Sequence, residues 1–221
     1  MPRKLGPQIT LEDIVSAAAA VLARDGYEGL TMRAVAAQIG VRAPSLYWHV
    51  KGKEDLSRLL FDQLIDNLDY GPLTGDWRAD LRSMAERLRA QLVGTRDITR
   101  VFPENYASGP HAIRSLERGL GLLRQAGVPA AEAMQAYAAA LSFIVGWAQF
   151  EVTQRANEGQ KPPGDSPDFS ALPNLAWALT SGDSQSGYDH GFRYGVDLLI
   201  AGLEQRLTTG VRKAAAPMSL E

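Results

Sequence analysis

The chain has 221 residues, of which 45% are hydrophobic, so it is long enough to bury a substantial apolar core. It contains no cysteine, which excludes disulfide bonds and thiolate metal sites. It also lacks an apolar run of about eighteen residues and an apolar stretch at its start, which argues against a membrane span and a secretory signal. We therefore expect a soluble protein of the cytoplasm.

The formal net charge of -2 is distributed unevenly. Residues 1–53 hold seven lysines and arginines against four acidic residues, a net charge of +3, which leaves -5 for the rest of the chain. A basic first segment on an acidic remainder concentrates the attraction for phosphate groups at one end of the protein. This asymmetry is a weak indication of nucleic-acid binding, because it also arises by chance.

Helical periodicity runs through nearly the whole chain and strand alternation is almost absent, so we predict an all-α fold. Residues 8–68 are predicted to form a three-helix helix-turn-helix domain, with a fourth helix at 53–69 leading out of it. Residues 70–208 are predicted to form a helical-bundle domain. Its helices are expected at about 76–93, 110–126, 130–156 and 187–207, with a loop at 157–187 that contains one short helix near 172–180. Residues 209–221 are predicted to be a disordered tail.

The segment from Leu30 to Lys53 carries the strongest motif. Two short helices that cross closely need a small residue at the crossing, and Ala36 provides it. The turn between them needs a residue that tolerates positive φ, and Gly40 follows four positions later. Pro44 lies in the first turn of the next helix, where its missing N–H is harmless. The pattern is typical of a helix-turn-helix at about residues 31–50.

The third helix of this motif has an unusual outer face. Leu46 and Val50 face the core, which leaves Tyr47, Trp48 and His49 outside. Exposed aromatic side chains are costly unless a partner covers them, and they suit a helix that enters the major groove of DNA. The competing interpretation is that Tyr47 and Trp48 belong to the core of a helical bundle, and that His49 is purely structural.

The run from Pro44 to Lys51, followed by Lys53, resembles the DNA-binding head of the TetR family of bacterial regulators. Segments 119–127, 132–151 and 190–207 resemble the core helices and the last helix of that family more loosely. The resemblance implies a homodimer that binds a palindromic operator in double-stranded DNA and is released by a small-molecule effector. The residues expected to contact DNA are Arg33, Arg42, Ala43, Pro44, Ser45, Tyr47, Trp48, His49 and Lys53.

Within this set, the residues differ in their expected roles. Arg33 can read a guanine, and Lys53 is expected to bind a backbone phosphate at the start of the next helix. Ala43 stands where the best-known member of the family has a glutamine that contacts a base. A methyl group cannot make that contact, so we expect a different operator sequence, with Arg42 on phosphate.

The body is expected to hold the effector and the dimer interface. Aromatic and methionine side chains with few polar neighbours suit a ligand cavity, although such a stripe is more often core. The expected cavity residues are Trp77, Met84, Leu88, Phe102, Tyr106, Met134, Phe143, Trp147 and Phe150. Glycines along one face of the last helix allow a second helix to approach closely, either in a partner subunit or within the same chain. The residues expected at the dimer interface are Gly191, Gly195, Leu198 and Gly202.

The best-known member of the family holds its drug as a magnesium chelate, through histidine and glutamate. At the matching positions this chain has Ser142 and Phe150, and Asp69 replaces a further histidine. We therefore expect no metal, no cofactor, and a flat or elongated apolar effector.

Other classes of function are weighed on the same residues. An enzyme is disfavoured because no metal-ligand spacing, phosphate loop or nucleophile motif occurs. A regulator that activates transcription, or that has no effector, stays open on the sequence alone.

Overall fold

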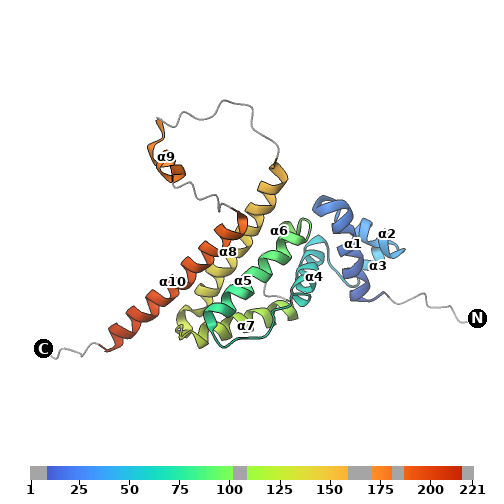
Figure 1. Ribbon diagram of the computed structural model, residues 1–221. Coiled ribbons are helices and arrows are strands. Elements are labelled where there is room, and N and C mark those ends of the chain that lie inside the picture. Colours follow the sequence, from blue (N-terminus) through green and yellow to red (C-terminus); the bar gives the residue numbers. More distant parts are fainter. Residues whose placement is uncertain (1–8, 102–108, 159–170, 181–186, 216–221) are drawn as a thin grey trace, which may run out of the picture.

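The computed structural model describes residues 9–101, 109–158, 171–180 and 187–215, and the regular structure in these ranges is helical (Figure 1). This confirms the predicted all-α class. None of the helices in these ranges is long and apolar enough to cross a membrane. The first four helices are α1 (Leu11–Gly29), α2 (Met32–Ile39), α3 (Ala43–Leu46) and α4 (Lys53–Asp66). The others are α5 (Trp77–Gly94), α6 (Ile98–Val101), α7 (Pro110–Gln125), α8 (Ala130–Asn157), α9 (Pro173–Thr180) and α10 (Tyr188–Ala215).

The head consists of α1, α2 and α3, and it lies at one end of the molecule in Figure 1, with the long helices α8 and α10 at the other. Helix α1 begins with a capping box in which Thr10 and Asp13 each accept a hydrogen bond from the other's backbone N–H, at 3.1 and 2.9 Å. Its apolar stripe is fully buried at Ile14, Ala18 and Val21. The helix period of the sequence thus defines which face of α1 packs inward.

Helix α4 connects the head to the body. Its buried residues Leu56, Leu60 and Leu64 belong to one apolar cluster that extends from α1 in the head to α10 in the body. The carboxylate of Asp62 accepts hydrogen bonds from the backbone N–H groups of His111 (3.0 Å) and Ala112 (2.9 Å), and so caps the start of α7. Asp62 therefore attaches α4 to the body, and the buried leucines of α4 attach it to the head.

Residues 96–100, which lead from the loop after α5 into α6, bind the end of α1. We name Arg96, Asp97 and Arg100 the α1 clamp. The Arg96 guanidinium donates to the carbonyl oxygens of Ala23 (3.0 Å) and Arg24 (2.8 Å), which lack partners at a helix end. The other two clamp residues hold the following turn: Asp97 accepts from the N–H of Tyr27 at 2.9 Å, and Arg100 pairs with Glu28 and lies over the Tyr27 ring.

A buried ion-pair network joins three helices of the body. The side chain of Glu151 on α8 has no exposed surface. Arg89 of α5 donates to it at 2.7 Å and also to Asp189 of α10 at 2.7 Å, while Arg155 donates to its other oxygen at 2.6 Å. A buried carboxylate needs such partners, because an unpaired charge in an apolar interior costs several kcal/mol. The network therefore fixes the positions of α5, α8 and α10 relative to one another.

Two features differ from the sequence expectation. Helix α10 continues to Ala215, although a disordered tail was predicted from residue 209. The hydroxyls of Thr208 and Thr209 donate back to the carbonyl oxygens of Glu204 and Gln205, so the two threonines are accommodated within the helix. Helix α6 was not predicted, because four residues are too few to show a period.

The buried network leads to a stability prediction. Arg89→Ala is expected to lower the free energy of unfolding by about 3 kcal/mol, because it leaves the Glu151 carboxylate poorly paired in the interior. Arg193→Ala is the control, because Arg193 forms an ion pair with Glu86 but is 64% exposed, and it should cost less than about 1 kcal/mol. Urea unfolding at a fixed protein concentration measures both. Equal losses in the two variants would contradict the role assigned to the network.

Candidate functional site

The corner between α2 and α3 is built as a tight helix-turn-helix. The hydroxyl oxygen of Thr31 caps α2 by accepting the N–H of Ala34 at 3.1 Å. Gly40 ends α2 with φ 85°, a left-handed conformation that favours glycine, and both Gly40 and Val41 donate to the carbonyl of Ala36. The core of the corner is formed by Val35, Ala36, Leu46 and Val50, each at most 2% exposed. The turn is thus fixed by backbone geometry and by packing.

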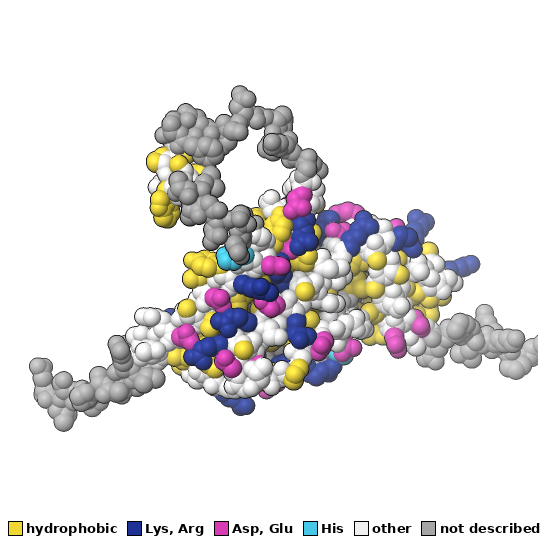
Figure 2. Space-filling view, viewed as in Figure 1, with side chains coloured by type: hydrophobic (Ala, Val, Ile, Leu, Met, Phe, Trp, Pro, Cys, Tyr) yellow, Lys and Arg dark blue, Asp and Glu magenta, His cyan; other side chains and the backbone are white. Residues whose placement is uncertain are grey.

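The outer face of this corner carries the exposed aromatic side chains. Regular helix in α3 ends at Leu46, and residues 47–49 continue as turns. Tyr47 is 56% and Trp48 90% exposed, and His49 is also exposed. An indole with almost its whole surface in water indicates a surface that another molecule covers. Figure 2 shows hydrophobic and basic side chains together on the head, at the right of the view.

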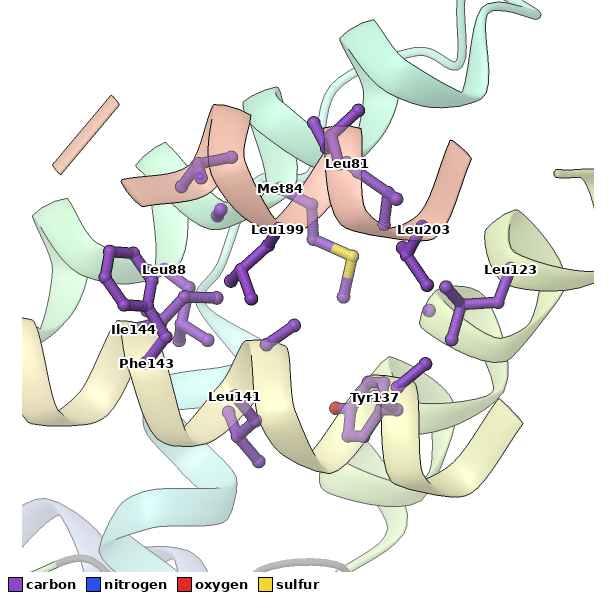
Figure 3. A pocket seen from close by; sticks show the side chains of 16 residues that line it. Leu81, Met84, Leu88, Leu123, Tyr137, Leu141, Phe143, Ile144, Leu199 and Leu203 are labelled. Carbon is purple, nitrogen blue, oxygen red and sulfur yellow. The ribbon is translucent and has the colours of Figure 1, made fainter. Parts of the chain in front are cut away.

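A cavity of about 70 Å³ lies in the body between α5, α7, α8 and α10 (Figure 3). Leucines from α5, α7 and α10 point into it together with Met84, and Phe143 and Ile144 of α8 also line it. Tyr137 is the one lining residue whose side chain carries a polar atom. The cavity can hold an apolar group, and it has no acid, base or nucleophile pair that could perform chemistry. Among the residues that the structure describes, no cluster of side chains is suited to hold a metal ion.

Comparison with known proteins matches both parts of the chain. Residues 14–59 match the family model described as bacterial regulatory proteins of the tetR family. Residues 71–207, more than half of the chain, match the model of the tetracyclin repressor-like C-terminal domain. The chain belongs to the TetR family. It is therefore a DNA-binding transcriptional regulator, as the helix-turn-helix in the sequence predicted.

Individual TetR-family relatives agree with this assignment over most of their length. The HTH-type transcriptional repressor DrrR1 of Streptomyces coeruleorubidus is 31% identical over 212 residues, which is 90% of this chain and 78% of the relative. The class D tetracycline repressor protein of Escherichia coli is 30% identical over 206 residues, 91% and 92% of the two chains. Both relatives are repressors.

Solved structures of the TetR-family protein ActR from Streptomyces coelicolor have the same fold. Apo ActR superposes with a TM-score of 0.78 at 26% identity, covering 96% of this chain and all of ActR. ActR in complex with actinorhodin gives a TM-score of 0.76 at 26% identity, covering 90% and 96% of the two chains.

Most of the DNA-contact residues predicted from the sequence lie in α3 or in the turns that follow it, whereas Arg33 lies in the first turn of α2. Arg33, Arg42 and Pro44 are exposed, and Ala43 and Ser45 are half-buried at the start of α3. The Lys53 ammonium instead donates to the carbonyl of Tyr27 at 2.8 Å and lies 3.7 Å from the centre of its ring. Lys53 therefore holds the start of α4 against the end of α1, a role that sequence spacing could not reveal.

Lys51 is a phosphate candidate that the sequence expectation omitted. It is exposed, and like Arg33 and Arg42 it has no ion pair within the described part of the chain. Its backbone N–H donates to Asp55, and this bond holds the pKa of the Asp55 carboxyl below its ordinary value. Arg24 of α1 and Arg58 of α4, by contrast, are already paired with aspartates. Lys51 was already among the basic residues of the head, but its lack of a partner is visible only in the structure.

The predicted effector residues divide between the cavity and other locations. Met84, Leu88 and Phe143 line the cavity. Four others do not line this cavity: Trp77 is buried elsewhere, Trp147 packs against Phe143 and Phe192, and Met134 and Phe150 are about half exposed. Aromatic spacing indicated an apolar face of α8, but that face packs largely on α10. Phe102 and Tyr106 lie outside the described residues.

Two glycines of α10 serve packing inside one subunit. A Cβ on Gly191 would lie 2.6 Å from the Trp147 ring, and a Cβ on Gly195 would lie 2.3 Å from the Phe143 ring. The expectation that these two residues admit a partner's helix is corrected, because α8 of the same chain occupies that space. Leu198 and Gly202, which were expected at the dimer interface with them, are exposed.

The two lysines at the start of α4 are predicted to behave differently. Lys51→Gln should weaken DNA binding equally for all sequences and reduce the slope of log affinity against log salt by about 1, without changing the unfolding midpoint. Lys53→Gln should also lower the free energy of unfolding by about 1 kcal/mol, because the hydrogen bond and ring contact to Tyr27 are lost. Mobility-shift titrations at several salt concentrations and urea unfolding test both. An unchanged salt slope for Lys51→Gln would refute its phosphate contact.

Proposed function

We propose that this protein is a homodimeric repressor that binds a palindromic operator and is released from it by a small molecule that enters the cavity of the body. The observation that carries the proposal is Trp48, 90% exposed on a rigidly held helix-turn-helix corner, in a basic segment whose Arg33, Arg42 and Lys51 have no ion pair with any residue that the structure describes. The relatives that are repressors, and ActR with its bound actinorhodin, support the same function. Such a regulator acts in the bacterial cytoplasm, where the DNA is.

The outer face of α8 and α10 supports a homodimer. Met134 of α8 is 48% exposed and Leu198 of α10 is 56% exposed. A hollow between the two helices is lined by small and apolar residues, including Ala139 and Gly202, and by the polar side chains of Glu132, Gln135 and Arg206. Exposed leucine and methionine beside a small-residue hollow form a surface that another helix can cover. A second copy of the chain is self-complementary at such a face when it is related by a two-fold axis.

Two-fold symmetry determines the form of the operator. The two reading corners of a symmetric dimer contact half-sites that are inverted copies of each other, spaced by about 34–36 Å in successive major grooves. An error of a few ångströms in this spacing removes one half-site from reach. A ligand that prefers the wrongly spaced conformation therefore releases the DNA.

The α1 clamp supplies a route from the cavity to the head. Helix α5 lines the cavity with Leu81, Met84 and Leu88, and its end leads directly into the clamp residues. A ligand that moves α5 also moves the hydrogen-bond partners of the last turns of α1. Because α1 packs on α2 and α4, the reading corner follows this movement.

Selection of binding sites from random DNA duplexes tests whether the protein recognises a specific sequence. The purified full-length protein is expected to enrich a palindrome of about 15 or more base pairs. Tyr47→Ala and Trp48→Ala should weaken binding to the enriched sequence far more than to random DNA, because the phosphate contacts remain. Failure to enrich any sequence at low salt would refute the function.

Glutamate substitutions at two leucines of similar exposure test whether the protein forms this dimer. Leu198→Glu is expected to lower dimer affinity at least about tenfold, because it buries a carboxylate without a partner. Leu73→Glu is the matched control, since Leu73 is 54% exposed in the loop before α5, away from this face, and should stay dimeric. Light scattering gives the mass, and mobility shifts should show operator binding lost only in Leu198→Glu. A dimeric Leu198→Glu variant would exclude this interface.

A further inference from the structure

The cavity of the body is lined almost entirely by aliphatic carbon. Its sixteen lining residues come from four helices, and all except Tyr137 and Phe143 are leucine, isoleucine, valine, methionine, alanine or glycine. Figure 3 shows the leucines of α5, α7 and α10 around the same space, with Met84 among them. Three other aromatic side chains of α8 and α10, Trp147, Phe150 and Phe192, pack on one another or on Phe143 and are not part of this lining.

The lining excludes a charged ligand. No lysine, arginine, aspartate, glutamate or histidine lines the cavity, and Arg89 and Glu151 are paired with each other outside it. A carboxylate or ammonium group that entered would lose its hydration without gaining a partner, which costs several kcal/mol. An uncharged hydrogen-bonding group can be accommodated at one point, beside the hydroxyl of Tyr137.

The space available favours a narrow ligand. A volume of about 70 Å³ equals roughly two water molecules, whereas ligand pockets commonly have about 300 Å³ or more, so a ligand must widen the cavity. The seam between α5 and α10 is held by three ion pairs, Arg78–Glu204, Arg82–Asp197 and Arg193–Glu86. Room can therefore come from rotamer changes of Met84 and the leucines, which suits a flexible chain.

A rigid flat ligand cannot be accommodated by such rotamer changes, because two aromatic rings of the lining are fixed by their neighbours. The ring of Phe143 is stacked on Phe192 at 5.5 Å between centroids and fills the space left by Gly195. Tyr137 is likewise seated over Gly119, where a Cβ would lie 2.6 Å from its ring. These rings have little freedom to turn, so a fused-ring molecule would have to separate the closely packed helices themselves.

We propose that the effector is an uncharged molecule with a slender aliphatic body and one hydrogen-bonding group. This inference rests on the proposed function, in which a ligand of this cavity releases DNA. Medium-chain alcohols, and esters or amides of similar length, have this chemistry. Ionised fatty acids and flat ring systems do not.

Three probes of ten carbons each separate the alternatives: 1-decanol, decanoate and 2-naphthol. Calorimetry with the full-length protein near neutral pH measures their binding directly. We expect 1-decanol to bind at least about tenfold more tightly than decanoate, which carries the charge, and more tightly than 2-naphthol, which is flat. Equal or tighter binding of decanoate or 2-naphthol, or no binding of 1-decanol, overturns the proposal.

A pair of variants on α5 identifies the site. Ala85→Leu fills the cavity from a lining position and should lower 1-decanol affinity at least about tenfold. Ala90→Leu makes the same change at an exposed position of the same helix and should leave the affinity unchanged. Equal affinity of the two variants for 1-decanol would show binding elsewhere and would overturn the assignment of this cavity.

If circular dichroism shows that Ala85→Leu does not fold, a variant with a smaller change in side-chain volume replaces it. Tyr137→Phe removes only the hydroxyl and should weaken 1-decanol binding by about threefold to tenfold. Unchanged affinity in this variant overturns the polar contact.

The failure of this inference is distinguishable from the failure of the proposed function. Mobility shifts with the selected operator report the function, and calorimetry reports the ligand. A protein that binds its operator but not 1-decanol keeps the function and loses the ligand class. A protein that binds 1-decanol in the cavity but selects no operator keeps the ligand class and loses the function.

Discussion

Helix α4 is shared between two packing units, and the arrangement of the molecule depends on this sharing. Its leucines belong to one apolar cluster that contains Ile14 of the head and Leu92 of the body. If α4 moved away from either side, it would leave a cavity in that cluster, at a cost that rises with the volume opened. The head is therefore not a separate unit on a flexible linker. It changes orientation only together with α4 and with the helices on which α4 rests.

Specific geometry at the junctions comes from acidic side chains, whereas the apolar core supplies the general cohesion. Asp62 caps α7 from α4, Asp97 holds the N–H of Tyr27, and Glu151 joins α5 to α8. Apolar contacts tolerate sliding, because any leucine face can pack on another. A carboxylate that must accept particular N–H groups allows one register only. Any movement between head and body must therefore either preserve these hydrogen bonds or break them.

The sequence was sufficient for the elements that have a period, a cap or a required small residue. The stripe of α1, the cap at Thr31 and the positive φ at Gly40 all follow from local chemistry, and the structure has each of them. The contents of the cavity could not be predicted in the same way. Which face of α8 meets α10 depends on contacts between residues about fifty positions apart, so aromatic spacing indicated an apolar face without showing what covers it. The contact of Lys53 with Tyr27 could not be predicted for the same reason, since Tyr27 lies 26 residues earlier.

Gly26 breaks α1 with φ 73°, and the missing side chain has a consequence for how this chain can change over time. A Cβ at this position would lie 2.6 Å from the Asp97 carboxylate, which is in turn held in place by the N–H of Tyr27. Neither position can be altered alone without a collision or a lost bond, although 70 residues separate Asp97 from its hydrogen-bond partner. A substitution at one of the two sites therefore requires a compatible substitution at the other, so in descendants of this protein the two positions can change only together.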